Sequence, residues 1–382
     1  MTALTAFANP PDPNDPTAAT GRPNLESILG AARKRIEVSD EELVEARSRR
    51  DLILAALLVE FPGSETYLNG SVAHGDALDP LTDVDLGIIV AEAVDTHGPG
   101  KKGCSDLEER AAEAIKKALR PQFENLRVEW RGRKRSVLVR FGDPVTPGQD
   151  DFTADVIVAI DNTDRGDNRG LWIPNHMGWD RSHPQEHTRL VKQANKKSTN
   201  TYARVVRLLK HWNRKNAKPL VSWNIKALAL GVLTQPSSLL AGLEDWFDYA
   251  IADLKVGLTE DPAGVAEKPI SINKDMARAE VVRRLEYARR LLTQAVGLEK
   301  AGYPAMAHES LAKMFNDPEM MPLPEPEVVR VETVRKFAAD RKAAQAAAGT
   351  STATVNVGAT TSKPARPVRS WTEPSMWNGH GQ

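Results

Sequence analysis

The sequence contains almost no cysteine. Cys104 is the single cysteine among 382 residues. One thiol can form neither an intrachain disulfide nor a zinc site with several cysteine ligands. The eight histidines show no metal-ligand spacing either. We therefore expect no zinc centre, and the scarcity of cysteine favours a reducing, cytoplasmic location.

The sequence also lacks a net charge, because 51 Lys and Arg residues balance 51 Asp and Glu residues. This balance argues against electrostatic attraction of the whole chain to nucleic acid or to an anionic membrane. Long apolar runs are missing too, since candidates such as 52–58 fall far short of the roughly 18 residues that a membrane span needs. The N-terminal residues lack the pattern of a signal peptide. We expect no membrane attachment and no extended nucleic-acid-binding surface.

The sequence has enough apolar residues for a sizeable core, with 41% hydrophobic and 27% charged residues. Residues 1–24 are rich in Pro and Asp and predict a disordered leader. Residues 25–185 alternate helix and strand signals and predict a first domain of helices and strands, whereas 186–315 are helical almost throughout and predict a second domain. Residues 316–382 predict a mostly disordered tail with a short helical patch at 334–348. The predicted fold class is α+β, with two lobes.

Local sequence patterns predict where the strands and helices lie. Short β-branched or aromatic runs predict strands at 66–68, 86–90, 126–130, 136–141 and 152–160. Ser39, with Glu42 three residues later, has the spacing of a capping box and predicts the start of a helix that extends to residue 61. Apolar residues at helical intervals predict further helices at 106–120, 202–212, 224–233, 239–255, 277–296 and 304–315.

An acidic pair follows a Gly-Ser dipeptide. Gly70-Ser71 comes directly after the first predicted strand, and Asp83 and Asp85 precede the apolar part of the second. Because side chains in a strand repeat every two residues, both carboxylates lie on one face. Their repulsion is costly unless cations lie between them, and such oxygen ligands suit Mg²⁺ that also binds substrate phosphates. Gly70 would let backbone N–H groups approach a phosphate, and the Ser71 hydroxyl could donate a further hydrogen bond.

A third carboxylate, Asp155, stands inside the apolar run 152–160. A charge is expensive to bury there, which favours a functional role. An Asp-x-Asp pair alone is often structural, because Asp at a strand end also forms turns. The combination of Gly-Ser, the acidic pair and the third Asp favours a site. We predict that Asp83, Asp85 and Asp155 are catalytic residues and metal ligands.

These residues resemble the signature of the nucleotidyltransferases of the DNA polymerase β superfamily: a Gly-Ser, an acidic pair on the next strand and a third acidic residue on a later strand. The segment GSVAHGDALDPLTDVDLGIIV is most similar to the cGAS/DncV-like nucleotidyltransferases (CD-NTases) of bacteria. The later segments VVRLLKHWNRKN and SWNIK are similar to the helical lobe of that family. The resemblance covers roughly residues 40–315. It implies a mixed sheet with flanking helices and a C-terminal helical lobe.

By this resemblance Lys210 and Ser222 would hold the triphosphate of a donor nucleotide, and Trp223 would stack on a base. A lysine is a point-charge phosphate ligand, a serine supplies one directed hydrogen bond, and an indole offers a stacking face. On sequence grounds alone Lys210 could equally be a solvated helix residue, and Trp223 a core residue. Many bacterial members carry Glu where Lys226 stands, so Lys226 is left outside the predicted site.

Two nearby features have simpler interpretations. A single loop histidine such as His74 is typical of an exposed residue, although it could touch substrate. The basic run 131–135 resembles a solvated hairpin turn, although it could bind RNA or a nucleotide. Neither is included in the predicted site.

The resemblance implies an enzyme that uses two Mg²⁺ ions, or Mn²⁺, to join nucleoside triphosphates into a cyclic di- or trinucleotide. This second messenger would activate a downstream effector in anti-phage defence of the CBASS type. In some systems of the family a ubiquitin-transfer-like protein conjugates the enzyme's C-terminus, and this chain ends Gly379-His380-Gly381-Gln382. Two alternatives remain: a nucleotidyltransferase acting on RNA, tRNA or protein, and a non-catalytic nucleotide-binding scaffold.

Overall fold

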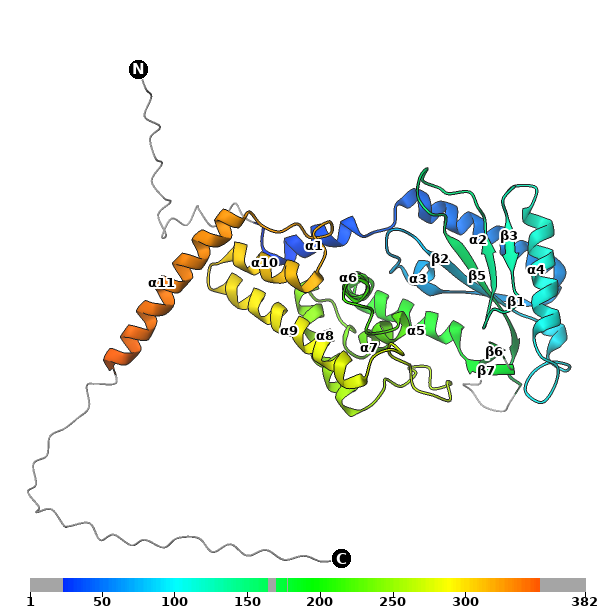
Figure 1. Ribbon diagram of the computed structural model, residues 1–382. Coiled ribbons are helices and arrows are strands. Elements are labelled where there is room, and N and C mark those ends of the chain that lie inside the picture. The colour runs from blue at the N-terminus through cyan, green and yellow to red at the C-terminus, as the bar shows by residue number, and fades with distance from the viewer. Residues whose placement is uncertain (1–22, 164–169, 177, 351–382) are drawn as a thin grey trace, which may run out of the picture. The chain divides into compact units, whose positions relative to one another are not determined.

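A computed structural model describes residues 23–163, 170–176 and 178–350 (Figure 1). The chain divides into a compact unit up to Thr333 and a second unit from Val334 onward. Nearly all of the predicted leader, 1–24, and the C-terminal Gly379 to Gln382 lie outside the described residues. None of the described helices has the length and apolarity that crossing a membrane requires.

The N-terminal half of the first unit contains a mixed sheet, as predicted, and its described residues form seven strands where the sequence predicted five. The strands are β1 (Glu65–Asn69), β2 (Asp83–Ile89), β3 (Arg127–Glu129), β4 (Val137–Arg140), β5 (Thr153–Asp161), β6 (Leu171–Asn175) and β7 (Gly178–Ser182). Their order is β1-β2-β5-β4-β3, and β6 pairs with β5 and β7. Strands β2 and β5 are parallel, and the other described strand pairs are antiparallel. The sequence pattern did not predict β6 and β7, because a proline and polar residues interrupt their apolar runs.

Two helices cover one face of this sheet. Helices α2 (Asp40–Glu60) and α4 (Ser105–Leu119) pack against each other and against the strands (Figure 1). The Ser39 side chain accepts a hydrogen bond from the Glu42 backbone N–H at 3.1 Å, so the predicted cap of α2 is confirmed. The shared core is aliphatic and aromatic, and includes Ile53, Leu57, Leu86, Ile88, Phe141, Val156 and Val158. A short 3₁₀ turn, η1 (Ala91–Ala93), follows β2.

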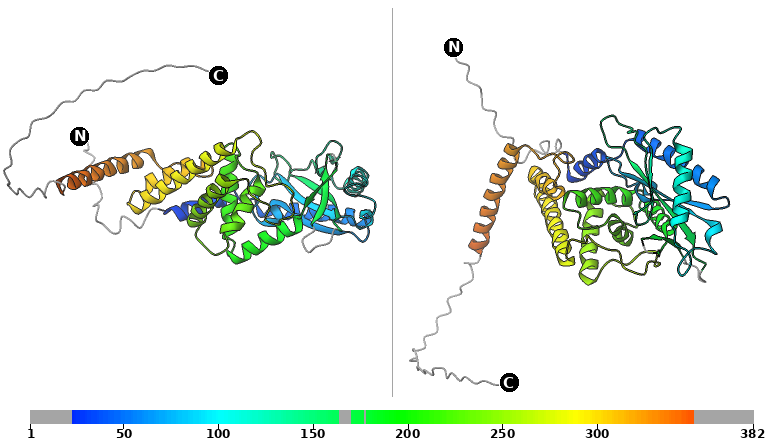
Figure 2. Two further views of the ribbon diagram at one scale, coloured as in Figure 1. Left: turned by 90° about the horizontal axis from the view of Figure 1, so that it is seen from below. Right: turned by 45° about the vertical axis from the view of Figure 1, so that its right-hand side comes forward.

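The rest of the first unit is helical, as predicted. It contains α5 (Pro184–Lys197), α6 (Thr201–Lys215), α7 (Ser222–Val232), α8 (Leu239–Val256), α9 (Arg278–Lys300) and α10 (Pro304–Phe315). Their apolar faces meet in a core that is separate from the core of the sheet. Phe247 is in edge-to-face contact with Trp212 and Trp246, with ring centroids 5.3 and 5.2 Å apart. Figure 2 shows these helices packed beside one another.

Helix α1 (Leu25–Arg35) belongs to the helical core and not to the sheet, although it precedes the sheet in sequence. Leu25 and Leu29 are fully buried there, and the Leu25 backbone N–H donates to Glu299 Oε1 at 2.6 Å. The sequence predicted that residues from 25 onward belong to the first domain, whereas in the structure α1 packs in the helical core. Chain order alone does not reveal that an N-terminal helix crosses to the other core.

The chain also stays packed beyond residue 315, where the sequence predicted a mostly disordered tail. Met320 and Met321 are buried in the helical core. Helix α11 runs over Pro326–Thr350, further than the expected patch at 334–348. The prolines near 321–326 suggested disorder, but the two buried methionines hold this segment against the helices.

Candidate active site

Three carboxylates meet where β2 and β5 run side by side. In the parallel pairing of these strands Asp85 lies directly opposite Asp155, and Asp83 lies two residues earlier on β2. Carboxylate oxygens of Asp83, Asp85 and Asp155 all lie within 4.8 Å of one another. All three residues are half-buried. The structure thus brings together the three predicted acidic residues.

Burial and repulsion between the carboxylates act together at Asp85. Burial first, and then the charges of Asp83 and Asp155, raise the pKa of Asp85 to about 7. At Asp155, the Ser136 hydroxyl donates to Oδ1 at 2.6 Å and Arg133 Nη2 donates to the same atom at 3.3 Å. Clustered hard oxygen donors with an unfavourable mutual charge fit a divalent cation such as Mg²⁺.

Gly70 lies against the same carboxylates. Asn69 pairs with Asp85 across β1 and β2, so the next residue begins α3 (Gly70–His74) beside the site. The φ angle of Gly70 is +76°, and a Cβ there would lie 1.7 Å from Asp85 Oδ2. Only glycine therefore allows this approach of the backbone to Asp85. Ser71 follows as a half-buried residue of α3.

A cavity of about 640 Å³, called here the first hollow, opens beside Thr82 and so next to Asp83. Ser222 and several basic residues line it, and its described lining contains no acidic residue. The basic residues are Lys210, Arg214, Lys218 and Lys274. Four cations without a carboxylate in the wall make this hollow suitable for a polyanion.

The N-terminus of α7 lies in the wall of the first hollow, because Val221 and Ser222 both line it. Val221 stands at the N-cap and provides no side-chain hydrogen bond, and the first turn contains no acidic residue. The first N–H groups of a helix have no partners within the helix, and they lie at the positive end of its dipole. An uncapped helix start of this kind is well suited to bind a phosphate.

Lys210 is not a solvated helix residue. Its Nζ donates to the backbone oxygen of Asp76 at 2.9 Å and to Asp76 Oδ1 at 2.8 Å, while the side chain also lines the first hollow. Lys226 Nζ lies 3.0 Å from Asp76 Oδ2 and 2.9 Å from His74 Nδ1. The interpretation of His74 as an exposed residue was wrong, since it is 2% exposed.

Sequence reasoning missed the group around Asp76 although one signal was present. Lys226 stands among the buried apolar residues 225–229 of α7. A charge inside an apolar run is the signal that singled out Asp155, and it applies equally here. The basic run 131–135 was likewise set aside, yet its Arg133 contacts Asp155.

A second hollow, of about 530 Å³, adjoins the first, and both are lined by Val221 and Ser271. Trp223 and His187 line the second hollow, with ring centroids 4.2 Å apart and planes inclined by 36°. His187 Nε2 in turn lies 2.7 Å from Asp261 Oδ1. Trp223 is only half-buried, so its indole can contact a ligand in this hollow.

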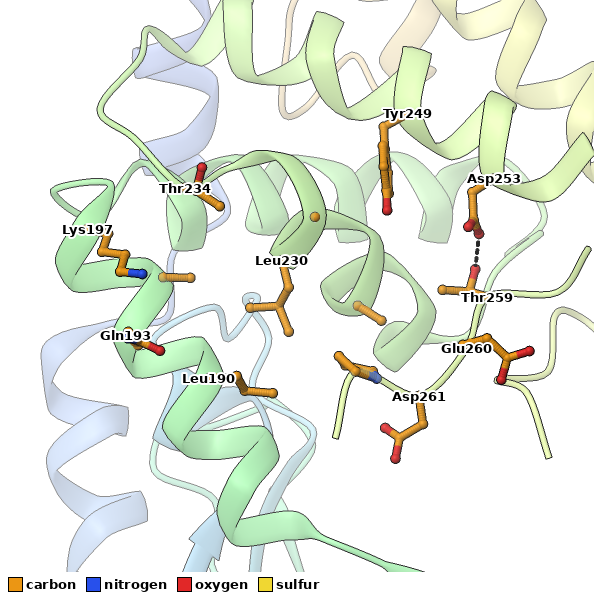
Figure 3. A pocket seen from close by; sticks show the side chains of 14 residues that line it. Leu190, Gln193, Lys197, Leu230, Thr234, Tyr249, Asp253, Thr259, Glu260 and Asp261 are labelled. Carbon is orange, nitrogen blue, oxygen red and sulfur yellow. Dashed lines mark hydrogen bonds between the residues drawn. The ribbon is translucent and has the colours of Figure 1, made fainter. Parts of the chain in front are cut away.

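A third hollow lies between α5, α7 and α8 and contains none of the predicted site residues (Figure 3). Leu190, Leu230 and Tyr249 point into it from these three helices. At its edge Thr259 Oγ1 donates to Asp253 Oδ2 at 2.7 Å. The third hollow shares Asp261 with the second, so this residue stands in the wall between them.

A mixed sheet that carries a triad of carboxylates, followed by a helical region, is the fold of the cGAS/DncV-like nucleotidyltransferases, and this chain has that fold. CdnC of E. coli MS115-1, solved with ATP, is 15% identical, with a TM-score of 0.58 over 79% of this chain and 99% of CdnC. DncV of Vibrio cholerae, a cyclic AMP-GMP synthase and prokaryotic cGAS homolog, is 13% identical, with a TM-score of 0.57 over 79% of this chain and 98% of DncV.

A third solved structure is the STING-associated c-di-GMP synthase CdnE from Capnocytophaga granulosa. It is 16% identical, with a TM-score of 0.52 over 70% of this chain and 86% of CdnE. No protein-family model and no curated protein sequence matches the chain. The similarity to the solved structures is therefore one of fold.

Proposed function

We propose that this protein is a metal-dependent nucleotidyltransferase that joins nucleoside triphosphates into a cyclic di- or trinucleotide. The observation that carries the proposal is the triad of Asp83, Asp85 and Asp155 beside a hollow lined by four cations and no carboxylate. The fold supports it, since CdnC was solved with ATP and DncV is a cyclic AMP-GMP synthase. By the same likeness, the product would activate an effector in anti-phage defence of the CBASS type.

In this proposal Asp83, Asp85 and Asp155 would hold two Mg²⁺ ions, which Mn²⁺ could replace. The bound ions would lower the pKa of the acceptor ribose hydroxyl and stabilise the pyrophosphate leaving group. Asp155 would take up the proton of that hydroxyl at a carboxylate oxygen. Ser136 and Arg133 hold this carboxylate in place from the loop that precedes β4.

The remaining residues position the substrates. Lys210 and the other cations of the first hollow would bind the donor triphosphate, and Ser222 would donate to a phosphate oxygen from the start of α7. The Trp223 ring would stack on a base in the adjoining second hollow. Nucleotidyl transfer needs little beyond such positioning and charge neutralisation along an in-line displacement.

A protein partner also belongs to the proposal. CdnC forms a complex with a HORMA protein, and a comparable regulatory protein would bind this chain.

The test uses the full chain with Mg²⁺ and all four nucleoside triphosphates, and measures pyrophosphate release and the mass of phosphatase-resistant products. The double variant Asp83→Ala/Asp85→Ala should lose about a thousandfold or more in rate, because the metal ligands are gone. Asp161→Ala is the matched control, since Asp161 is an exposed aspartate on the same strand as Asp155.

Full activity in the double variant would contradict the metal assignment. Linear products, or label transferred to RNA, tRNA or protein, would identify the alternative nucleotidyltransferase. Magnesium-dependent nucleotide binding without turnover would instead identify a scaffold.

The pKa of Asp85 adds a pH dependence to this test. Metal binding requires the carboxylate form, and burial and the neighbouring charges raise the pKa of Asp85 to about 7. Mg²⁺ affinity should therefore increase as the pH rises through about 7, as titration calorimetry at about pH 6 and about pH 8 would measure. Equal affinities at both pH values would argue against Asp85 as a ligand.

A further inference from the structure

The segment 74–77, shortly after Gly70-Ser71, is held by the helical half of the unit through its backbone carbonyl groups. The carbonyl oxygens of residues 74–77 each accept a hydrogen bond from a side chain of α5 or α6. Asn195 donates to the carbonyl of residue 74 at 3.0 Å, and Lys210 donates to the carbonyl of residue 76 at 2.9 Å. Arg207 donates to the carbonyls of residues 75 and 77, at 2.7 and 3.0 Å. Four successive bound carbonyls leave this segment little freedom.

The side chains of the same segment reach further into the helices. Asp76 is fully buried and lies between the ammonium groups of Lys210 on α6 and Lys226 on α7. Burial alone would raise the pKa of Asp76, but the two lysines outweigh it and lower this pKa to about 2. Asp76 is therefore a permanent anion between two cations.

His74 extends this arrangement to α5. Burial, and then Lys226, lower the pKa of His74 to about 3, so the ring is neutral. Lys226 Nζ then donates to Nδ1, which leaves the ring proton on Nε2, where it faces Thr188 Oγ1 at 3.0 Å. The Thr188 hydroxyl donates to the backbone oxygen of Leu68 on β1 at 3.0 Å. One lysine thus connects α7 to the segment on both sides of Gly75.

Lys226 lies one helical turn after Ser222, so these contacts join the two parts of the proposed phosphate site. Gly70 and Ser71 precede the segment 74–77, and Ser222 begins the helix that carries Lys226. Replacement of a buried ion pair by apolar residues of similar volume is often neutral or stabilising, so stability alone does not explain these charges. The charges are better explained by what they fix in place.

We infer that Lys226, together with Asp76, is a positioning residue for nucleotidyl transfer that holds Gly70-Ser71 in register with the start of α7 around the donor triphosphate. This inference rests on the proposed function. Lys226 acts through the loop and the helix, so its loss should weaken substrate binding more than it slows the chemical step. Lys226→Met conserves the volume of the side chain and leaves Asp76 paired with Lys210.

The experiment compares Lys226→Met with the wild type by hydrogen exchange and by steady-state kinetics. Amide exchange in residues 70–77 should accelerate about tenfold in the variant, because the segment loses its contacts to α7. The KM for ATP should rise about tenfold while kcat falls by less than about threefold, since the lost contact serves binding. Asp76→Asn is the second variant, and it should accelerate exchange in the same segment.

Asp317→Asn is the matched control. Asp317 is also buried and is also paired with side chains of α6, namely His211 at 2.8 Å and Lys215 at 3.0 Å, but it contacts no part of the segment 70–77. Asp317→Asn should lower the melting temperature and leave both the exchange of residues 70–77 and the KM unchanged. A KM that changes equally in the control would overturn the inference.

The two proposals can fail separately. Unchanged exchange of residues 70–77 in Lys226→Met would overturn the positioning role, whatever the activity of the wild type. A wild type that neither binds nor turns over nucleotides would contradict the proposed function, and the exchange measurement needs no substrate.

Discussion

At the scale of single residues the site depends on how closely Gly70 approaches Asp85. A methyl group at position 70 would overlap Asp85 Oδ2, and the carboxylate would have to turn away from Asp83 and Asp155. The backbone at Gly70 also has a positive φ, which a side chain disfavours. Conformational strain and steric overlap therefore act together at this position, and a second glycine allows them to be separated.

Gly70→Ala should abolish measurable Mg²⁺ binding and reduce nucleotide turnover by about a hundredfold or more, because a displaced catalytic carboxylate is very costly to the rate. Gly63→Ala is the control: Gly63 has the same φ of +76°, but a Cβ there meets nothing within 4 Å. It should lose only about 1 kcal/mol of unfolding free energy and keep full activity. Thermal unfolding, metal titration and turnover measure these effects, and identical behaviour of the two variants would exclude the overlap as the cause.

Single residues also show what could be predicted from the sequence. Asp155 was found because a charge inside an apolar strand needs a reason to be buried. Lys226 has the same signal, and only the resemblance to the CD-NTases, many of which carry Glu at this position, kept it out of the predicted site. For Asp76 no local pattern is informative, because its lysine partners lie more than a hundred residues later on α6 and α7.

At the scale of elements the site is made by two pairings and one helix start. The parallel register of β2 and β5 brings Asp85 and Asp155 together, and the antiparallel register of β1 and β2 brings Gly70 to them. The Asp-x-Asp spacing predicted that Asp83 and Asp85 share one face of β2. It could not predict that β5 is the strand paired with β2, because that depends on the topology of the sheet. The start of α7 adds unpaired N–H groups to the first hollow, and an altered cap there tests their role.

Val221→Asp should stabilise the protein and weaken substrate binding at the same time. The backbone of Val221 is extended, as a cap requires, so an aspartate would gain about 1 kcal/mol as an N-cap. Its charge would also enter the first hollow, and the KM for ATP should rise about tenfold through repulsion of the triphosphate. Val221→Ser is the control, because a serine can also cap α7 but adds no charge. It should raise the melting temperature without raising the KM. Thermal unfolding and kinetics measure both quantities, and a KM that is unchanged in Val221→Asp would mean that phosphates do not bind at this helix start.

At the scale of the whole molecule the described structure shows where the first unit ends. Residues 316–333 contribute buried side chains to it, among them Met320, Met321 and Glu332, whose carboxylate accepts from the Met306 backbone N–H at 3.0 Å. Composition alone marked this segment as a tail, because prolines and charged residues outnumber its apolar residues. Two methionines are too few to produce a periodic signal, so their burial could not be predicted.

Truncation after Thr333 should leave the unfolding free energy and nucleotide turnover close to those of the full chain. Truncation after Phe315 removes Met320, Met321 and the partner of His211, and should cost about 3 kcal/mol or more. Denaturant unfolding of both truncated proteins makes the comparison. Equal stability of the two would show that the packing of residues 316–333 contributes little.

The two separate cores support different predicted site residues. The carboxylates stand on strands whose apolar side chains belong to the sheet core, whereas Lys210, Ser222 and Trp223 stand on helices of the other core. Under the proposed function, repacking of the helical core would therefore change which nucleotides bind, while the strands keep the carboxylates in register. Substitutions in the helical core that spare the contacts to residues 74–77 would then alter substrate preference without displacing the carboxylates, so random mutagenesis for altered specificity is best directed at the helices.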